Sequence, residues 1–182
     1  MYSIDVFILA GGQGRRMGYQ DKGLVSYQNK RLIQHVIDKL KPQSNSIHIL
    51  ANQNMEIYES FGYPVFEDLE SGFQGPLMGM LTAMTHSKAD AILFVPCDTP
   101  YIPPNLLLKM TQELHRTSAE IVVAIDDTNK EHAVTCLTAR CLKGELAQFL
   151  KNGNRKVMEW NHSRNLASVK FEHAHFLNVN SL

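Results

Sequence analysis

Short, continuous apolar runs alternate along this chain with segments whose apolar residues recur every three or four positions. Continuous runs are typical of buried β-strands, and the longer spacing is typical of helices. The predicted strands are Val6–Leu9, Ile47–Ala51, Val65–Phe66, Ala91–Val95, Ile121–Ile125 and Ala133–Leu137, with strand or extended chain at Ser168–Phe171 and Phe176–Val179. The predicted helices are Leu32–Leu40, Met55–Phe61, Pro76–Met84 and Leu142–Leu150.

This order predicts an α/β fold: three layers, Rossmann-like, with a central, mostly parallel sheet flanked by helices. Ala91–Val95 is apolar at every position, which indicates a strand that helices cover on both faces. No linker, repeat or change in composition divides the chain, so we expect one domain over residues 1–182. In such sheets, ligands bind beyond the carboxyl ends of the strands.

The first predicted strand runs into a loop that is rich in glycine and in positive charge. Its residues of these two kinds are Gly11, Gly12, Gly14, Arg15, Arg16, Gly18 and Lys22. Because glycine has no Cβ, a ligand can touch the main chain there, and exposed N–H groups with nearby cations suit phosphates. The spacing matches neither the Walker A pattern nor the dinucleotide pattern Gly-x-Gly-x-x-Gly. A plain turn would not need three cations, so we expect a phosphate ligand of another kind.

The composition narrows the class of ligand and the compartment. Lys and Arg number 18, as do Asp and Glu, so no net charge draws the protein to nucleic acid or to an anionic membrane. The cations of the loop are a local concentration, which favours a small phosphorylated ligand. We find no apolar run long enough to cross a bilayer and no signal peptide. Three cysteines without a Cys-x-x-Cys pair fit reduced thiols in the cytoplasm and argue against zinc.

A second candidate site follows the strand Ala91–Val95. Asp98 lies between Pro96 and Pro100, so we expect its carboxylate to be held rigidly at the end of a strand. If this strand and the first predicted strand are parallel, the glycine-rich loop begins at the same edge of the sheet. Phosphates and a carboxylate repel each other unless a cation lies between them, and Mg²⁺ is the simplest such ion. Asp68, which also follows a predicted strand, is a candidate second acidic contact, and a turn or helix cap explains it almost as well.

Three segments together resemble a known enzyme family. The first is Leu9–Gly18 with Asp21-Lys22, the second is Gly75–Gly79, and the third is Pro96–Pro103. The first alone resembles the wide superfamily of nucleotidyltransferases. All three in this order resemble the molybdenum cofactor guanylyltransferases, which make the guanine dinucleotide form of the cofactor by transferring GMP from GTP to molybdenum-bearing molybdopterin and releasing pyrophosphate.

The resemblance implies roles for individual residues. On the nucleotide side these are backbone contacts from Leu9, Ala10, Gly11 and Gly12, contact from Asp68, phosphate neutralisation by Arg16 and Lys22, and Mg²⁺ binding by Asp98. On the acceptor side they are Gly75 and Gly79 beside the ligand, Asn178 and Asn180 near the pterin, and Arg155 or Lys156 at its phosphate. Catalytic work would fall to Asp98, Lys22 and Arg16.

The chain departs from the family at the base contact. Leu50 stands where the family can have an asparagine that faces the nucleotide, and Asn52 is the candidate replacement. His132-Ala133 also replaces a frequent His-Pro pair.

Other activities remain as alternatives. The same motifs suit cytidylyl transfer or sugar-1-phosphate nucleotidyl transfer, and a carrier could bind nucleotide and molybdopterin without catalysis. The resemblance implies GTP and molybdenum-molybdopterin as partners, with transient contacts to molybdopterin-inserting proteins and to recipient molybdoenzymes. His173-Ala-His175 has the alternation that places two imidazoles on one strand face, but no third ligand is evident, so we expect surface histidines.

Overall fold

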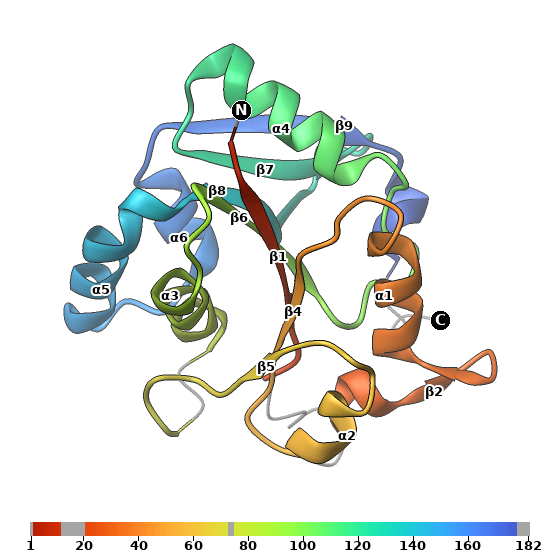
Figure 1. The fold of residues 1–182 in the computed structure, drawn as a ribbon. Coiled ribbons are helices and arrows are strands. Elements are labelled where there is room, and N and C mark those ends of the chain that lie inside the picture. Colours follow the sequence, from red (N-terminus) through yellow and green to blue (C-terminus); the bar gives the residue numbers. More distant parts are fainter. Residues whose placement is uncertain (1, 12–20, 73–74, 178–182) are drawn as a thin grey trace.

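The structure is a computed structural model that describes residues 2–11, 21–72 and 75–177. Within them, seven strands form one sheet in the order β5-β4-β1-β6-β8-β7-β9 (Figure 1). All neighbouring pairs in this sheet are parallel except those that involve β8, which runs antiparallel to both β6 and β7. The strands are β1 (Ile4–Leu9), β4 (Ile47–Leu50), β5 (Val65–Phe66), β6 (Ala91–Pro96), β7 (Ile121–Asp126), β8 (Glu131–Ala139) and β9 (Leu166–Phe171). The predicted mostly parallel sheet is confirmed.

Helices cover both faces of the sheet and make three layers (Figure 1). One face packs on α1 (Leu32–Leu40), α2 (Met55–Glu59) and α4 (Leu106–Thr117), and the other on α3 (Pro76–His86), α5 (Lys143–Lys151) and α6 (Val157–His162). Alternate residues of β1 enter the two cores: Val6 and Ile8 face one, and Phe7 faces the other. Every residue from Ala91 to Val95 is buried, as expected for a strand covered on both sides.

The helix boundaries follow local chemistry. Pro76 stands at the first position of α3, where a missing N–H costs nothing. α1 ends at Leu40, just before Pro42, as predicted. The amphipathic α1 buries Leu32, Ile33, Val36, Ile37 and Leu40, which lie on one side of the helix.

Several elements differ from the sequence prediction. Phe176 is the last residue of a 3-10 turn, His173–Phe176, and not the start of a strand; Asn178 and Val179 lie outside the described residues. The antiparallel direction of β8 was not predicted. Four elements have no predicted bounds: β2 (Ser26–Tyr27), β3 (Lys30–Arg31), α4 and α6. All of these except α4 are short, and their sequences carry little periodicity.

The strand directions indicate which edge of the sheet carries the site. The carboxyl ends of β1, β4, β5, β6, β7 and β9 all lie at this edge, and because β8 is antiparallel, its first residues lie there too. In the part of the chain that the structure describes, no helix combines the length and the apolar character needed to span a bilayer.

Candidate active site

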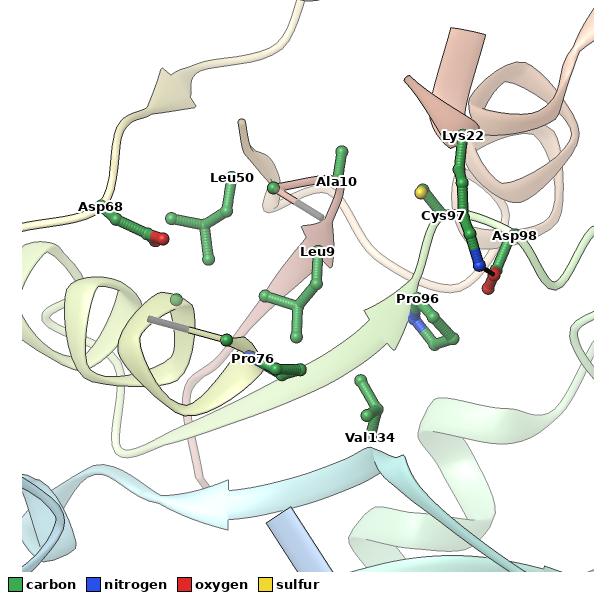
Figure 2. A pocket seen from close by; sticks show the side chains of 13 residues that line it. Leu9, Ala10, Lys22, Leu50, Asp68, Pro76, Pro96, Cys97, Asp98 and Val134 are labelled. Carbon is green, nitrogen blue, oxygen red and sulfur yellow. Dashed lines mark hydrogen bonds and ion pairs between the residues drawn. The ribbon is translucent and has the colours of Figure 1, made fainter. Parts of the chain in front are cut away.

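A pocket of about 450 Å³ opens at the carboxyl edge of the sheet (Figure 2). Its walls come from four strand ends, from the start of α3 and from β8. The lining residues are Leu9, Ala10, Gly11, Lys22, Leu50, Asp68, Gly75, Pro76, Gly79, Pro96, Cys97, Asp98 and Val134.

The register of the sheet brings the predicted motifs together. Leu9 at the end of β1 pairs with Leu50 of β4 on one side and with Pro96 of β6 on the other. The residues that follow these strands therefore meet, and Asp68 follows the next strand, β5. Figure 2 shows Asp68 and Asp98 at opposite sides of the pocket, with Leu9 and Leu50 between them.

Lys22 and Asp98 form an ion pair at one side of the pocket. Lys22 Nζ lies 3.2 Å from Asp98 Oδ2, and the two side chains are 31% and 13% exposed. Their residues are 76 positions apart in the chain, so only the fold joins them. The sequence prediction that the glycine-rich loop and Asp98 share one site holds for Lys22; Gly12 and Arg16 lie outside the described residues.

Asp21 fixes the backbone from which Lys22 extends. Its buried carboxylate accepts hydrogen bonds from the Tyr58 hydroxyl and from Asn54 Nδ2, the second at 3.1 Å. Gly23 packs against the same ring, because a Cβ there would lie 2.5 Å from the Tyr58 hydroxyl oxygen. Burial raises the pKa of Tyr58 far above its usual value, which nearby Cys97 and Asp21 reinforce, so the hydroxyl keeps its proton and donates it. Sequence reasoning quoted Asp21 in a motif but missed this role.

Asn52 lies behind Asp68 and holds it toward the pocket. Asn52 Nδ2 donates to Asp68 Oδ2 at 2.8 Å, and the Asp68 backbone N–H donates to Asn52 Oδ1 at 2.9 Å. Asn52 Nδ2 also reaches the carbonyl of Gly11 at 3.4 Å. Burial raises the pKa of Asp68, and the hydrogen bond from Asn52 opposes that rise. Asn52 is not among the residues that line the pocket, whereas Leu50 is.

Two glycines of the site are needed for close packing. A Cβ on Gly11 would lie 2.8 Å from Asn52 Nδ2, inside any normal contact. A Cβ on Gly79 would lie 3.3 Å from Leu9 Cδ2 and 3.5 Å from Asp68 Oδ1, and it would fill part of the pocket. Gly75 has a φ of +85°, which favours glycine for a different reason, the left-handed backbone.

Cys97 reaches the pocket beside Asp98, yet it is a packing residue. It is 5% exposed, and burial followed by the charge of Asp98 raises the pKa of its thiol well above the usual range. A thiol held in its neutral form is a poor nucleophile.

The acceptor-side predictions meet the structure only in part. Gly75 and Gly79 line the pocket, but Arg155 and Lys156 do not. Arg155 Nη1 donates to the carbonyls of Leu150 and Asn154, and Lys156 Nζ lies 2.8 Å from Glu159. Asn178 and Asn180 lie outside the described residues.

Val134 is a lining residue that sequence reasoning did not single out. In the pairing of β7 with β8, Val123 faces Cys136 and the next residue, Ala124, faces His132. Residues 133–135 therefore form a bulge, a device that redirects side chains next to ligand sites. The bulge places Val134 at the pocket wall, where Figure 2 shows it below Pro96.

The described residues could hold a divalent ion only if substrate and water supply most of its ligands. Within the described ranges, no cluster of three or more His, Cys, Asp or Glu side chains is placed to hold a metal. Asp98 offers a hard carboxylate oxygen beside a position that already takes a cation, the Lys22 ammonium. An ion at Asp98 would therefore take most of its ligands from substrate phosphates and water, which is how Mg²⁺ is usually held.

Comparison with known proteins identifies the family of the chain. Residues 6–166 match the model of the MobA-like NTP transferase domain. A molybdenum cofactor guanylyltransferase of Haemophilus influenzae is 45% identical over 99% of this chain and 94% of its own length.

Solved structures confirm the fold. The crystal structure of molybdopterin-guanine dinucleotide biosynthesis protein A from Archaeoglobus fulgidus superimposes with a TM-score of 0.80 at 22% identity, over 97% of this chain and 92% of that one. A Mycobacterium tuberculosis protein solved in complex with manganese has a TM-score of 0.73 at 18% identity, over 97% and 92%.

The sequence relationship is stronger evidence than the shared fold, because it extends over nearly the whole length of both chains at 45% identity. The chain is a nucleotidyltransferase and belongs to the molybdenum cofactor guanylyltransferase family, within the MobA-like NTP transferases.

Proposed function

We propose that the protein transfers GMP from GTP to the phosphate of molybdenum-bearing molybdopterin and releases pyrophosphate. The observation that carries the proposal is the Lys22–Asp98 pair, which meets the start of the glycine-rich loop at Gly11 in one pocket. A cation for phosphate and a carboxylate for a metal thus stand together at the edge where such sheets bind nucleotides.

The reaction needs positioning more than acid–base chemistry. An oxygen of the acceptor phosphate attacks the α-phosphorus of GTP, and the bond from that phosphorus to the bridging oxygen breaks as pyrophosphate leaves. A phosphate near neutral pH is already an anionic nucleophile, so no protein base has to deprotonate it. Among the described lining residues the polar side chains are Lys22, Asp68, Cys97 and Asp98, a set suited to holding charge.

The three charged side chains of this set, Lys22, Asp68 and Asp98, each have a proposed task. Lys22, with Arg16, neutralises the β- and γ-phosphates and the departing pyrophosphate. Asp98 would hold Mg²⁺, which supplies charge neutralisation at the α-phosphate. When nucleotide is bound, Lys22 would exchange the Asp98 carboxylate for phosphate oxygens.

The base is proposed to lie between Leu9, Leu50 and Asp68. Leu9 and Leu50 offer apolar surface, and Leu50 cannot form the hydrogen bonds of an asparagine. Among the described residues on this side of the pocket, Asp68 is therefore the polar side chain that reads the base. Guanine presents two adjacent N–H donors on one edge, which a carboxylate can accept as a pair. The backbone of Leu9, Ala10, Gly11 and Gly12 completes the contacts.

The acceptor is proposed to lie beyond Gly75 and Gly79, toward Asn178 and Asn180. Of the two candidate phosphate ligands, Lys156 is the better placed to exchange partners. Its ion pair with Glu159 is largely exposed, so a phosphate can compete for the ammonium. Arg155 is tied to two backbone carbonyls.

The test is to incubate the protein with Mg²⁺, molybdenum-bearing molybdopterin and GTP, CTP or ATP in turn, and to measure pyrophosphate. Of the three nucleotides, only GTP should release pyrophosphate, and guanylated pterin should form in equal amount. Release with CTP in place of GTP would indicate a cytidylyltransferase. Release with a sugar 1-phosphate in place of the pterin would indicate a sugar-1-phosphate nucleotidyltransferase. No pyrophosphate with any nucleotide would favour the carrier.

Three wider predictions belong to the same proposal. One domain over residues 1–182 carries the activity. The product passes by transient contact to molybdopterin-inserting proteins and recipient molybdoenzymes. The three cysteines, all unpaired, are consistent with work in the reducing cytoplasm.

A further inference from the structure

Asp126 is a buried carboxylate that the proposed chemistry does not use. It is the last residue of β7, at the carboxyl edge of the sheet, and is fully buried. Its Oδ1 accepts the backbone N–H of Thr128 at 2.9 Å, the Thr128 hydroxyl at 2.5 Å and the backbone N–H of Lys130 at 3.1 Å. Three bonds to one oxygen hold the carboxylate rigidly.

The other carboxylate oxygen joins two histidines from separate elements. Asp126 Oδ2 lies 2.9 Å from His132 Nε2 on β8 and 2.7 Å from His173 Nδ1 in the C-terminal turn. Because a carboxylate only accepts, both ring nitrogens donate to it. Although burial acts to raise the pKa of Asp126, the bonds from Thr128, His173 and His132 hold that pKa far below its usual value.

His132 borders the bulge that lines the pocket. Residues 133–135 of that bulge carry Val134 to the pocket wall. The bulge is held at one end by His132 on Asp126, and from the opposite layer by Asn161, whose buried Nδ2 donates to the Ala133 carbonyl at 2.9 Å.

His173 belongs to a turn that is held at three points. His173 binds Asp126, and its backbone N–H donates to Asp127 Oδ1 at 3.1 Å. Phe176 is buried and stacks on the His132 ring with centroids 4.0 Å apart.

The third point connects the turn to the segment that carries Asp98. His175 Nδ1 donates to the carbonyl of Tyr101 at 2.8 Å. Tyr101 follows Asp98 by three residues, with Pro100 between them. The turn is therefore tied to the segment that follows β6, three residues beyond Asp98.

We propose that Asp126 is a positioning residue for the acceptor half of the site, through the two histidines that it holds. Through His132 it fixes the bulge that carries Val134 to the pocket wall, and through His173 it fixes the turn whose Phe176 stacks on the His132 ring. This inference rests on the proposed function, because it needs an acceptor.

The sheet order explains why the acceptor and not the nucleotide is affected. The proposed contacts to the base come from β1, β4 and the segment after β5, on one side of β6, and Asp98 follows β6 itself. Asp126, His132 and His173 belong to β7, β8 and the turn after β9, on the other side of β6.

The experiment compares steady-state kinetics for the two substrates. His173→Ala is the main variant, because this side chain is 45% exposed and its loss leaves the core intact. The KM for molybdenum-bearing molybdopterin should rise at least fivefold, while the KM for GTP stays within twofold of wild type. His173→Asn should restore the acceptor KM, because an asparagine Nδ2 lies close to the place of the histidine Nδ1. Folded Asp126→Ala protein should show the same rise in the KM for molybdenum-bearing molybdopterin.

The matched control is His115→Ala. His115 lies in the last turn of α4, which leads to the start of β7 at the other edge of the sheet. Both KM values should remain at wild-type levels.

A second measurement does not depend on turnover. In His173→Ala, amide hydrogen exchange over residues 173–177 should be at least fivefold faster than in wild type, and unchanged exchange there would contradict the tether. Two results would overturn the positioning role alone, provided that the wild-type protein is active. In one, His173→Ala has the same KM values as wild type; in the other, His173→Ala raises both KM values together. A wild-type protein that is inactive with every nucleotide would overturn the proposed function and the acceptor role with it.

Discussion

Removal of the Asn52 side chain should weaken GTP binding although Asn52 does not line the pocket. Asn52→Ala deletes the 2.8 Å bond to Asp68 Oδ2 and the 2.9 Å bond from the Asp68 backbone. Bonds to charged groups contribute about 1.5–3 kcal/mol when well shielded. Asp68 is half-buried, so solvent screening reduces this to about 1–2 kcal/mol. Because about 1.4 kcal/mol is a factor of ten, the Kd for GTP should rise about 5- to 30-fold.

The assay is calorimetric titration of GTP with Mg²⁺ into wild-type and variant protein. Asn165→Ala is the control, because it removes an amide that binds the Ser118 carbonyl far from the pocket; its Kd should stay within twofold of wild type. If Asn52→Ala binds GTP as tightly as wild type does, Asp68 either needs no support or does not contact the nucleotide, and this reasoning is wrong.

Three further predictions concern the supports of the site. Gly23→Ala, whose new Cβ would meet the Tyr58 hydroxyl, should lower the free energy of unfolding by about 1–3 kcal/mol in urea titrations and weaken GTP binding; wild-type values for both would exclude tight packing there. Lys22→Ala should raise the Kd for GTP about tenfold or more, and an unchanged Kd would remove Lys22 from the phosphate site. The free energy of unfolding should fall as the pH falls, because folding lowers the pKa values of Asp126 and His132. The contribution of His132 is lost below the unfolded histidine pKa of about 6.5, and that of Asp126 is lost below the unfolded aspartate pKa of about 4. Asp126→Asn should flatten the acid end of that curve, and a curve parallel to wild type would contradict the assignment.

Strong periodicity made the central fold predictable. The strand at Ala91–Val95 and the helix at Leu32–Leu40 are long or fully apolar, so their burial follows from sequence pattern alone. Lys22 and Asp98 could be placed in one site because parallel strands end at the same edge.

The remaining elements depend on contacts between distant residues. The direction of β8 is set by its partners β6 and β7, and an apolar run has no direction of its own. His173 and His175 alternate as in a strand, but their ring nitrogens bind Asp126 and the Tyr101 carbonyl, which a 3-10 turn allows. The hydrogen bond from Tyr58 to Asp21 joins residues that are 37 positions apart, so no local sequence pattern predicts it.

The most direct test of the account follows the α-phosphate itself. GTP labelled at the α-phosphorus is mixed with molybdenum-bearing molybdopterin, Mg²⁺ and either wild-type protein or Asp98→Asn, a variant of the same shape without the charge. With wild type, the label should appear on the pterin in equal amount to the pyrophosphate released. Asp98→Asn should fold normally and lose at least about 100-fold in rate, about 2.7 kcal/mol of transition-state stabilisation. Label that stays in GTP with wild type, or full transfer by Asp98→Asn, would contradict the account.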